Sequence, residues 1–231
     1  MKEAIILAGG LGTRLYPLTL TVPKPMVPVA GQPFLEYLLR RLQGHGFNRV
    51  VLSVGYLGEQ IEAYFGRQWR GLELLYTYEK SPLGTGGAIA LAMSGIQSEH
   101  VLVLNGDTFC AVDWKLMFDF HTAKHADLSI ALKPMQSFER YGNVKVLNDR
   151  VVSFEEKRCV ISGQINTGVY ILKKSLFNPF LMPEVFSFET DFLQCKLNEV
   201  LVCAFITEAY FIDIGVPEDY QRAQIELSEK V

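Results

Sequence analysis

Two cationic side chains, Arg14 and Lys24, follow a glycine-rich turn close to the start of the sequence. The turn comprises residues 9–13 and comes directly after a short apolar run. Glycine lets main-chain N–H groups come close to a ligand, which the binding of a polyphosphate requires. The Arg14 guanidinium is a permanently charged fork that suits phosphate oxygens, and Pro23 and Pro25 stiffen the segment that presents Lys24. The pattern therefore predicts a site for a highly anionic ligand.

Two carboxylates, Asp107 and Asp213, each follow an apolar run that is typical of a buried strand. An aspartate at a strand end is commonly a turn former or a cap. When two strands lie side by side, however, carboxylates at their ends can hold one divalent ion such as Mg²⁺ against a phosphate group. A metal site is therefore a second hypothesis for this pair.

Arg14, Lys24 and Asp107 follow strands that alternate with helices in the first half of the chain. The predicted strands are Ala4–Ala8, Arg49–Val54, Leu72–Tyr78 and His100–Leu104, and the predicted helices are Pro33–Leu42, Gly58–Phe65 and Ala88–Met93. Such alternation is typical of a parallel sheet covered by helices, with ligands bound at the carboxyl ends of the strands.

A second glycine-rich segment, Glu79–Ala88, follows the third predicted strand. Its glycines leave room for a flat ring against the backbone, and its amides can face a ligand. A tight turn between a strand and a helix is the alternative interpretation, because glycine is common in such turns.

From Gly142 onward, short strands with polar turns replace most of the helices. The predicted strands of the second half are Asp127–Leu132, Asn143–Leu147, Val151–Glu155, Ile165–Leu172 and Val200–Ile206, and its predicted helices are Trp114–Lys124, Ser187–Leu197 and one that opens at Pro217. Asp113 and Ser187 are suited to cap the first two of these helices. We expect an antiparallel lobe here.

His121 and His125 are four residues apart on a predicted helix, and so on one face. A metal site would need a third ligand and an open coordination position, and no His-Glu-x-x-His pattern occurs. We therefore expect a solvated helix face.

Length and composition exclude several classes of protein. With 231 residues and 49% hydrophobic content, the chain can bury one large core or two joined lobes. The net charge of −3 and the pI near 5.9 argue against a partner that is a nucleic acid or a membrane surface. Without a signal peptide or an apolar run of roughly 20 residues, a cytoplasmic location is expected, and the four cysteines are expected to be reduced. The composition leaves a homo-oligomer open.

The whole string around the first turn is more specific than its glycines. Residues 9–14 read Gly-Gly-Leu-Gly-Thr-Arg and are followed by Pro17-Leu18-Thr19 and by Pro23-Lys24-Pro25-Met26. This string resembles the signature of the sugar-1-phosphate nucleotidylyltransferases. A dinucleotide-binding loop would need a third glycine after Gly12, and a P-loop would need a Gly-Lys-Ser/Thr ending; the sequence has neither.

The resemblance runs from Ile5 through Asp213 and implies a fold and a reaction. The implied fold is α/β, a Rossmann-like, mostly parallel sheet flanked by helices with a smaller antiparallel sugar-binding lobe. Residues 1–231 would form a single catalytic domain without a C-terminal β-helix domain, because no hexapeptide repeat occurs. The implied enzyme joins a nucleoside triphosphate and a sugar 1-phosphate into a nucleotide sugar and releases pyrophosphate.

The resemblance also implies roles for individual residues. Arg14 and Lys24 would be catalytic, and Asp107 and Asp213 would hold Mg²⁺. The implied nucleotide-binding residues are Leu7, Ala8, Gly9, Gly10, Gly12, Thr13, Glu79, Pro82, Leu83, Gly84, Thr85, Gly86, Asn105 and Gly106. The implied sugar-phosphate-binding residues are Gly142, Glu156, Lys157, Asn166 and Thr167. Many relatives have proline where this chain has Arg158, which bears on how Lys157 is presented.

Further motifs look like one branch of the family. Residues 83–87 are closer to guanylyltransferases than to thymidylyl enzymes, which implies GTP as the donor. Residues 105–109, 186–189 and 212–220 look like the branch that uses D-glycero-α-D-manno-heptose 1-phosphate in making bacterial surface polysaccharides. A mannose-1-phosphate guanylyltransferase, a uridylyl- or thymidylyltransferase, a nucleotide-sugar-dependent glycosyltransferase and a non-catalytic nucleotide-sensing subunit are the alternatives.

Overall fold

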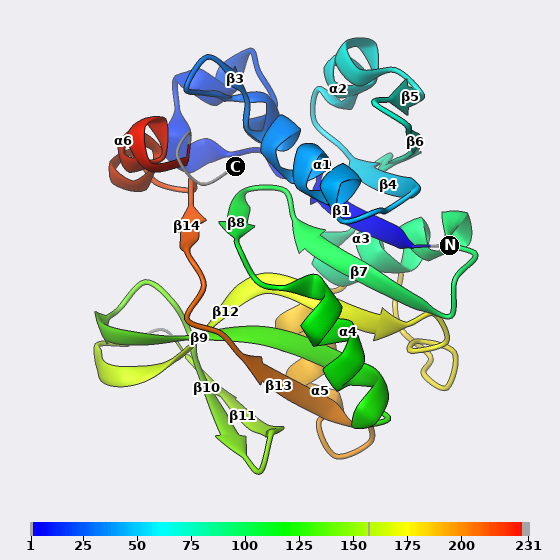
Figure 1. Cartoon of the computed structure of the whole chain (residues 1–231), viewed down its shortest axis with the longest axis vertical. Coiled ribbons are helices and arrows are strands. Elements are labelled where there is room, and N and C mark those ends of the chain that lie inside the picture. Colours follow the sequence, from blue (N-terminus) through cyan, green and yellow to red (C-terminus); the bar gives the residue numbers. More distant parts are fainter. Residues whose placement is uncertain (1, 157, 228–231) are drawn as a thin grey trace.

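The fold is built on one ten-stranded sheet within the described residues, which are 2–156 and 158–227 of this computed structural model (Figure 1). Its parallel half contains, in spatial order, β7 (His100–Asn105), β1 (Glu3–Ala8), β4 (Arg49–Val54) and β6 (Leu72–Tyr78). The short antiparallel strand β5 (Gln68–Trp69) forms the edge of this half. The predicted parallel sheet is confirmed, and its strands agree with the prediction to within one residue at each end.

The antiparallel part continues the same sheet and is not a separate body. Its strands are, in spatial order from β7, β12 (Val160–Lys173), β9 (Leu128–Phe138), β13 (Val202–Ile206), β11 (Arg150–Glu155) and β10 (Asn143–Leu147). Strand β12 runs antiparallel to both β7 and β9, so it joins the two halves. The expected antiparallel lobe is therefore present, with β13 parallel to β9 as an exception.

Helices cover both faces of the sheet because side chains along a strand alternate between the two faces. In β1, Ala4 and Ile6 pack into one core and Ile5 packs into the other. The first face is covered by α1 (Phe34–Gly44), α2 (Gly58–Phe65), α4 (Trp114–Ala123) and α6 (Pro217–Glu226). The second face is covered by α3 (Gly84–Ala92) and by a π-helix (Phe188–Leu193) that continues into the short α5 (Gln194–Lys196). No helix in the described part of the chain is long and apolar enough to cross a membrane.

Several short elements complete the fold, and most of them lie at the sheet edge that carries the predicted site; η4 follows α3 at the opposite edge. The 3₁₀ turns are η1 (Thr13–Leu15), η2 (Leu18–Leu20), η3 (Lys24–Met26) and η4 (Met93–Gly95). Two-stranded pairs are formed by β2 (Pro28–Val29) with β3 (Gln32–Pro33) and by β8 (Thr108–Cys110) with β14 (Phe211–Asp213). The second pair sets Asp213 opposite Thr108, directly beside Asp107.

Two predicted helices differ in form. Helix α3 begins at Gly84, so the glycines predicted to lie in a loop form its first turn. The predicted helix Ser187–Leu197 has Ser187 as its N-cap, as expected, but starts with the wider π turn. Asp113 also caps α4 as predicted, accepting a hydrogen bond from the Leu116 amide at 3.0 Å.

The expectation of a solvated face at His121 is wrong. Its side chain is buried, with Nδ1 2.8 Å from Ser129 Oγ and Nε2 3.1 Å from His100 Nδ1. Trp114 and Met117 precede His121 at helical spacing and belong to the same buried stripe of α4, so the side chain is drawn into the core. His125 lies beyond the helix, with a φ of 50°.

Candidate active site

Three charged side chains meet around Gly215, just beyond the end of β14, and a fourth, Asp107, pairs with one of them. A methyl group on Gly215 would lie 3.1 Å from Arg14 Nη2, 3.2 Å from Lys24 Nζ and 2.6 Å from Asp213 Oδ1. Lys24 Nζ in turn donates to Asp107 Oδ2. The structure thus brings together the two cations and the two carboxylates that the sequence singles out.

Lys24 is buried and anchored by an ion pair, whereas Arg14 is exposed. Lys24 opens η3, its side chain is only 8% exposed, and it is fixed by the ion pair with Asp107. Arg14 lies in η1 and is exposed. Between them, Gly12 has a φ of 65°, and a Cβ there would lie 3.0 Å from the Cβ of Lys24 and closer still to Thr19. Glycine is therefore required for the turn that packs against Lys24.

Asp107 and Asp213 form a pair that could hold a divalent cation. Burial, and next the nearby charge of Asp107, raise the pKa of Asp213, while the Gly215 amide donates to its Oδ1 at 2.7 Å. Two close carboxylates repel each other, and a cation between them removes that cost. No cluster of three or more metal-binding side chains occurs in the described residues. Mg²⁺ is commonly held by one or two carboxylates and takes its other ligands from phosphates and water. The residues present therefore fit the implied metal.

Two adjoining cavities lie at the carboxyl ends of β1, β6 and β7. The larger, about 750 Å³, is lined by Gly9, Gly10, Gly12, Thr13, Arg14, Lys24, Glu79, Pro82 and Asp107, together with Tyr56 and Lys80. The smaller, about 300 Å³, is lined by Leu7, Ala8, Gly84, Thr85, Asn105 and Gly106, among others. All but two of the predicted nucleotide-binding residues thus line one of these cavities.

The two exceptions, Leu83 and Gly86, pack inside the protein. The amides of Gly86 and Gly87 donate to the Phe186 carbonyl at 3.0 and 3.4 Å, and the Phe186 amide donates to the Leu83 carbonyl at 3.0 Å. A side chain on Gly86 would collide with the ring of Phe186. Close packing against residues 184–186 therefore explains the glycines of this segment. The role of the segment in binding a nucleotide stays a prediction.

A third cavity, about 410 Å³, shares Arg14, Asn105 and Asp107 with the first two cavities. Of the predicted sugar-phosphate residues, it is lined by Gly142, Glu156 and Asn166; Lys157 lies outside the described residues. Thr167 does not line it, because its side chain is fully buried and its hydroxyl donates to the Ala131 carbonyl at 2.8 Å. Asp107 and Arg14 therefore lie where the third cavity adjoins the first two.

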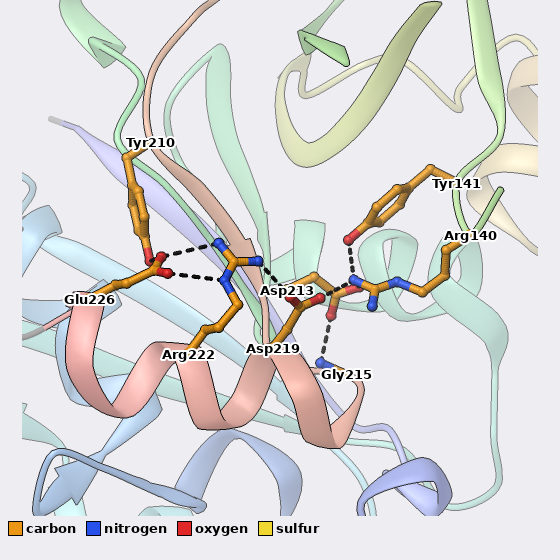
Figure 2. Close-up of polar contacts among 8 residues, drawn as sticks. All are labelled: Arg140, Tyr141, Tyr210, Asp213, Gly215, Asp219, Arg222 and Glu226. Carbon is orange, nitrogen blue, oxygen red and sulfur yellow. Dashed lines mark hydrogen bonds and ion pairs between the residues drawn. The ribbon is translucent and has the colours of Figure 1, made fainter. Parts of the chain in front are cut away.

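Arg140 is a site residue that the sequence reasoning missed (Figure 2). Its guanidinium donates to Asp219 and to the Tyr141 hydroxyl, and Nη2 lies 3.8 Å from Asp213 Oδ2. Asp219 belongs to α6 and also pairs with Arg222 at 2.8 Å. Arg140 therefore connects Tyr141, which lines the third cavity, to Asp213 and to the C-terminal helix. The sequence indicates Gly142 nearby as a site residue, but a charged loop residue beside it carries no signal of its own.

Comparison with known proteins identifies the family of this chain. The family model described as nucleotidyl transferase matches residues 3–230. The D-glycero-alpha-D-manno-heptose 1-phosphate guanylyltransferase of Aneurinibacillus thermoaerophilus is 47% identical over 99% of this chain and 100% of its own length. The enzyme of the same name from Campylobacter jejuni is 45% identical over 94% of this chain and 96% of its own.

Solved structures are similar over the same extent. HddC from Yersinia pseudotuberculosis, complexed with GMP-PN, superposes with a TM-score of 0.86 at 38% identity, covering 98% of this chain and all of that one. A putative glucose-1-phosphate thymidylyltransferase from Bacillus anthracis, at 24% identity and a TM-score of 0.84 over 97% of this chain and 94% of that one, shares the fold. The chain described here therefore belongs to the nucleotidyl transferase family.

Proposed function

We propose that the chain transfers GMP from GTP to D-glycero-α-D-manno-heptose 1-phosphate, giving GDP-heptose and pyrophosphate. The observation that supports this most is the convergence of Arg14, Lys24 and Asp213 around Gly215, with Asp107 paired to Lys24, between the first two cavities and the third cavity. The names of the relatives from A. thermoaerophilus and C. jejuni support this donor and this sugar.

The chemistry is an in-line displacement at the α-phosphorus of the triphosphate. An oxygen of the sugar phosphate forms the new P–O bond, and the bond to the bridging oxygen of the pyrophosphate breaks, so no covalent enzyme intermediate is needed. Catalysis of this kind depends on positioning and on neutralising charge.

The charged residues divide this work between them. Arg14 is exposed and lines the larger cavity. We assign to it the neutralisation of negative charge on the triphosphate and on the leaving pyrophosphate. Lys24 is anchored by Asp107, and its ammonium bridges the two phosphates that react. Mg²⁺ held by Asp107 and Asp213 would polarise the α-phosphate.

The test is a matrix of the four nucleoside triphosphates against heptose, mannose and glucose 1-phosphates, measured by the release of pyrophosphate with and without Mg²⁺. We expect the highest kcat/KM for GTP with the heptose 1-phosphate, and no turnover when the metal is chelated. Preference for another triphosphate would remove the guanylyl assignment, and absence of pyrophosphate in every well would remove the enzyme assignment.

One alternative has specific support. A mannose-1-phosphate guanylyltransferase from Mycobacterium tuberculosis is 35% identical over 97% of this chain and 64% of its own length. In the same matrix, this alternative predicts that mannose 1-phosphate is the better substrate. A glycosyltransferase would instead consume a nucleotide sugar without releasing pyrophosphate, and a sensing subunit would bind GTP without turnover.

A further inference from the structure

The hydrogen bonds of Asn166 are almost fully used inside the protein. Its Nδ2 donates to the Tyr170 hydroxyl at 2.7 Å and to Glu189 Oε1 at 2.5 Å, and its Oδ1 accepts from the Gly168 amide at 2.9 Å. A side-chain amide has two N–H groups to donate. Both are engaged, so Asn166 has no donor left for a sugar hydroxyl, although it lines the third cavity.

The hydroxyl of Tyr170 fixes the same carboxylate oxygen. Tyr170 is buried on β12, and its hydroxyl donates to Glu189 Oε1 at 2.9 Å. Burial raises the pKa of Tyr170 well above its usual value, so the hydroxyl keeps its proton and remains a donor. Asn166 and Tyr170 thus hold one oxygen of Glu189 from two directions.

The second oxygen of Glu189, Oε2, has no hydrogen-bond partner among the described residues. The exposed side chain of Glu189 lines the third cavity. Glu189 comes from the first turn of the π-helix, and such helices often occur at functional sites because they displace side chains from the regular helical pattern.

Glu155, a carboxylate lining the same cavity, differs from Glu189 because both of its oxygens have partners inside the protein. Its Oε1 is bound by Lys145 at 2.6 Å, and its Oε2 by Asn143 at 2.7 Å and Arg158 at 3.2 Å. These donors, Lys145 first, lower the pKa of Glu155 to about 2. Glu155 is therefore committed to structure, whereas Glu189 presents an oriented acceptor to the cavity.

We propose that Glu189 is a specificity-determining residue that accepts hydrogen bonds from hydroxyl groups of the sugar, and that Asn166 and Tyr170 are positioning residues acting through it. The inference rests on the proposed function, since it names what recognises the sugar in that reaction. A carboxylate suits a polyhydroxylated ring, because each hydroxyl can donate a charge-assisted hydrogen bond to it. A sugar that lacks the matching hydroxyl leaves the carboxylate desolvated and unpaired, which is how such a site discriminates.

The experiment compares wild type with Glu189→Gln and Tyr170→Phe, varying the sugar 1-phosphate at saturating GTP and then GTP at saturating sugar 1-phosphate. We expect Glu189→Gln to raise KM for the sugar 1-phosphate by about tenfold, the usual size for one hydrogen bond to a charged group, with KM for GTP unchanged. Tyr170→Phe should change the same KM in the same direction by a smaller factor. Glu199→Gln, which alters an exposed carboxylate paired with Lys196, is the matched control.

A series of sugar 1-phosphates that each lack one hydroxyl distinguishes direct contact between Glu189 and the sugar from a purely structural role of Glu189. For the analogue without the recognised hydroxyl, wild type and Glu189→Gln should have the same KM. The proposal would be overturned if Glu189→Gln raised KM for GTP as much as KM for the sugar 1-phosphate. It would also be overturned if wild type and Glu189→Gln discriminated equally among all the analogues.

Direct binding keeps this test independent of turnover. If wild type shows no turnover at all, the proposed function fails, and calorimetry with heptose 1-phosphate and a non-hydrolysable GTP analogue then decides the role of Glu189. Binding to wild type that Glu189→Gln loses would support the proposal. Binding that is equal in the two proteins, or absent from both, would refute it.

Discussion

At the scale of single residues, the ammonium of Lys24 is the group most dedicated to the chemistry. It is buried, fixed by Asp107, and adjacent to both Arg14 and Asp213. Lys24→Met keeps the apolar stem and removes the charge, so we expect kcat to fall by about a hundredfold or more, as for other groups that stabilise transition-state charge. Pyrophosphate release measures this, with Lys115→Met on α4 as a control. Near-normal turnover with an intact circular dichroism spectrum would remove the assigned role.

Gly215 offers a second test at this scale, because its missing side chain leaves room for three charged groups. A methyl group there would press on Asp213, Arg14 and Lys24. We expect Gly215→Ala to lower kcat/KM by about tenfold or more, since small displacements of catalytic groups are costly, while the urea midpoint changes little. Gly44→Ala, where a methyl group meets open space at the end of α1, should leave activity unchanged. Equal activity of the two variants would contradict this reading of the site.

The sequence predicted the meeting of Arg14, Lys24, Asp107 and Asp213, because residue types that suit phosphates and metals stood at strand ends. Their roles in catalysis stay predictions. Arg140 could not be found in this way, since an arginine in a polar loop has the same pattern as a solvated charge. Only the fold reveals that Asp219, in the first turn of α6, lies beside it.

At the scale of elements, Arg140 connects the loop after β9 with α6. The planar guanidinium contacts Asp219, Tyr141 and Asp213 at once, which a lysine cannot reproduce. We therefore expect Arg140→Lys and Arg140→Met both to raise KM for the sugar 1-phosphate by about tenfold. Arg222→Met, which removes a more exposed partner of the same Asp219, is the control and should leave KM within about twofold, because exposed ion pairs contribute little. Similar KM values for the Arg140 and Arg222 variants would show that Arg140 has no special role.

Helix α3 shows why element boundaries were harder to predict than element types. Its glycines looked like a loop because helices disfavour glycine, yet close packing against Phe186 requires them. We expect Gly86→Ala to lower the free energy of unfolding by about 1–3 kcal/mol, the usual cost of overpacking a core, in urea titrations. Gly86→Ala combined with Phe186→Leu should recover part of the loss if the contact is the cause. If Gly86→Ala alone were as stable as wild type, the ring of Phe186 would adjust to the added methyl group without cost.

At the scale of the whole molecule, the antiparallel half of the sheet is as much a part of the core as the parallel half. The sequence predicted its strands but not their continuity, because the pairing of β12 with β7 joins residues that are far apart in the chain. Long-range pairing of this kind has no local signal. His121 lies near this junction, close to His100 on β7 and to Ser129 on β9.

The burial of His121 should make global stability depend on pH. Burial, with His100 and Lys173 nearby and Asp127 opposing them, lowers the pKa of His121 from 6.5 to about 4. Between pH 4 and pH 6.5 the unfolded chain therefore binds a proton at this residue that the folded chain does not. The contribution of His121 to the free energy of unfolding is complete above about pH 6.5. It is lost as the pH drops toward 4, by about 3 kcal/mol at most. Urea unfolding across this range measures the slope. His121→Gln should have a flatter profile in that window than wild type, whereas His45→Gln, a change at an exposed histidine, should keep the wild-type slope. Parallel profiles for wild type and His121→Gln would mean that the buried imidazole is not the source.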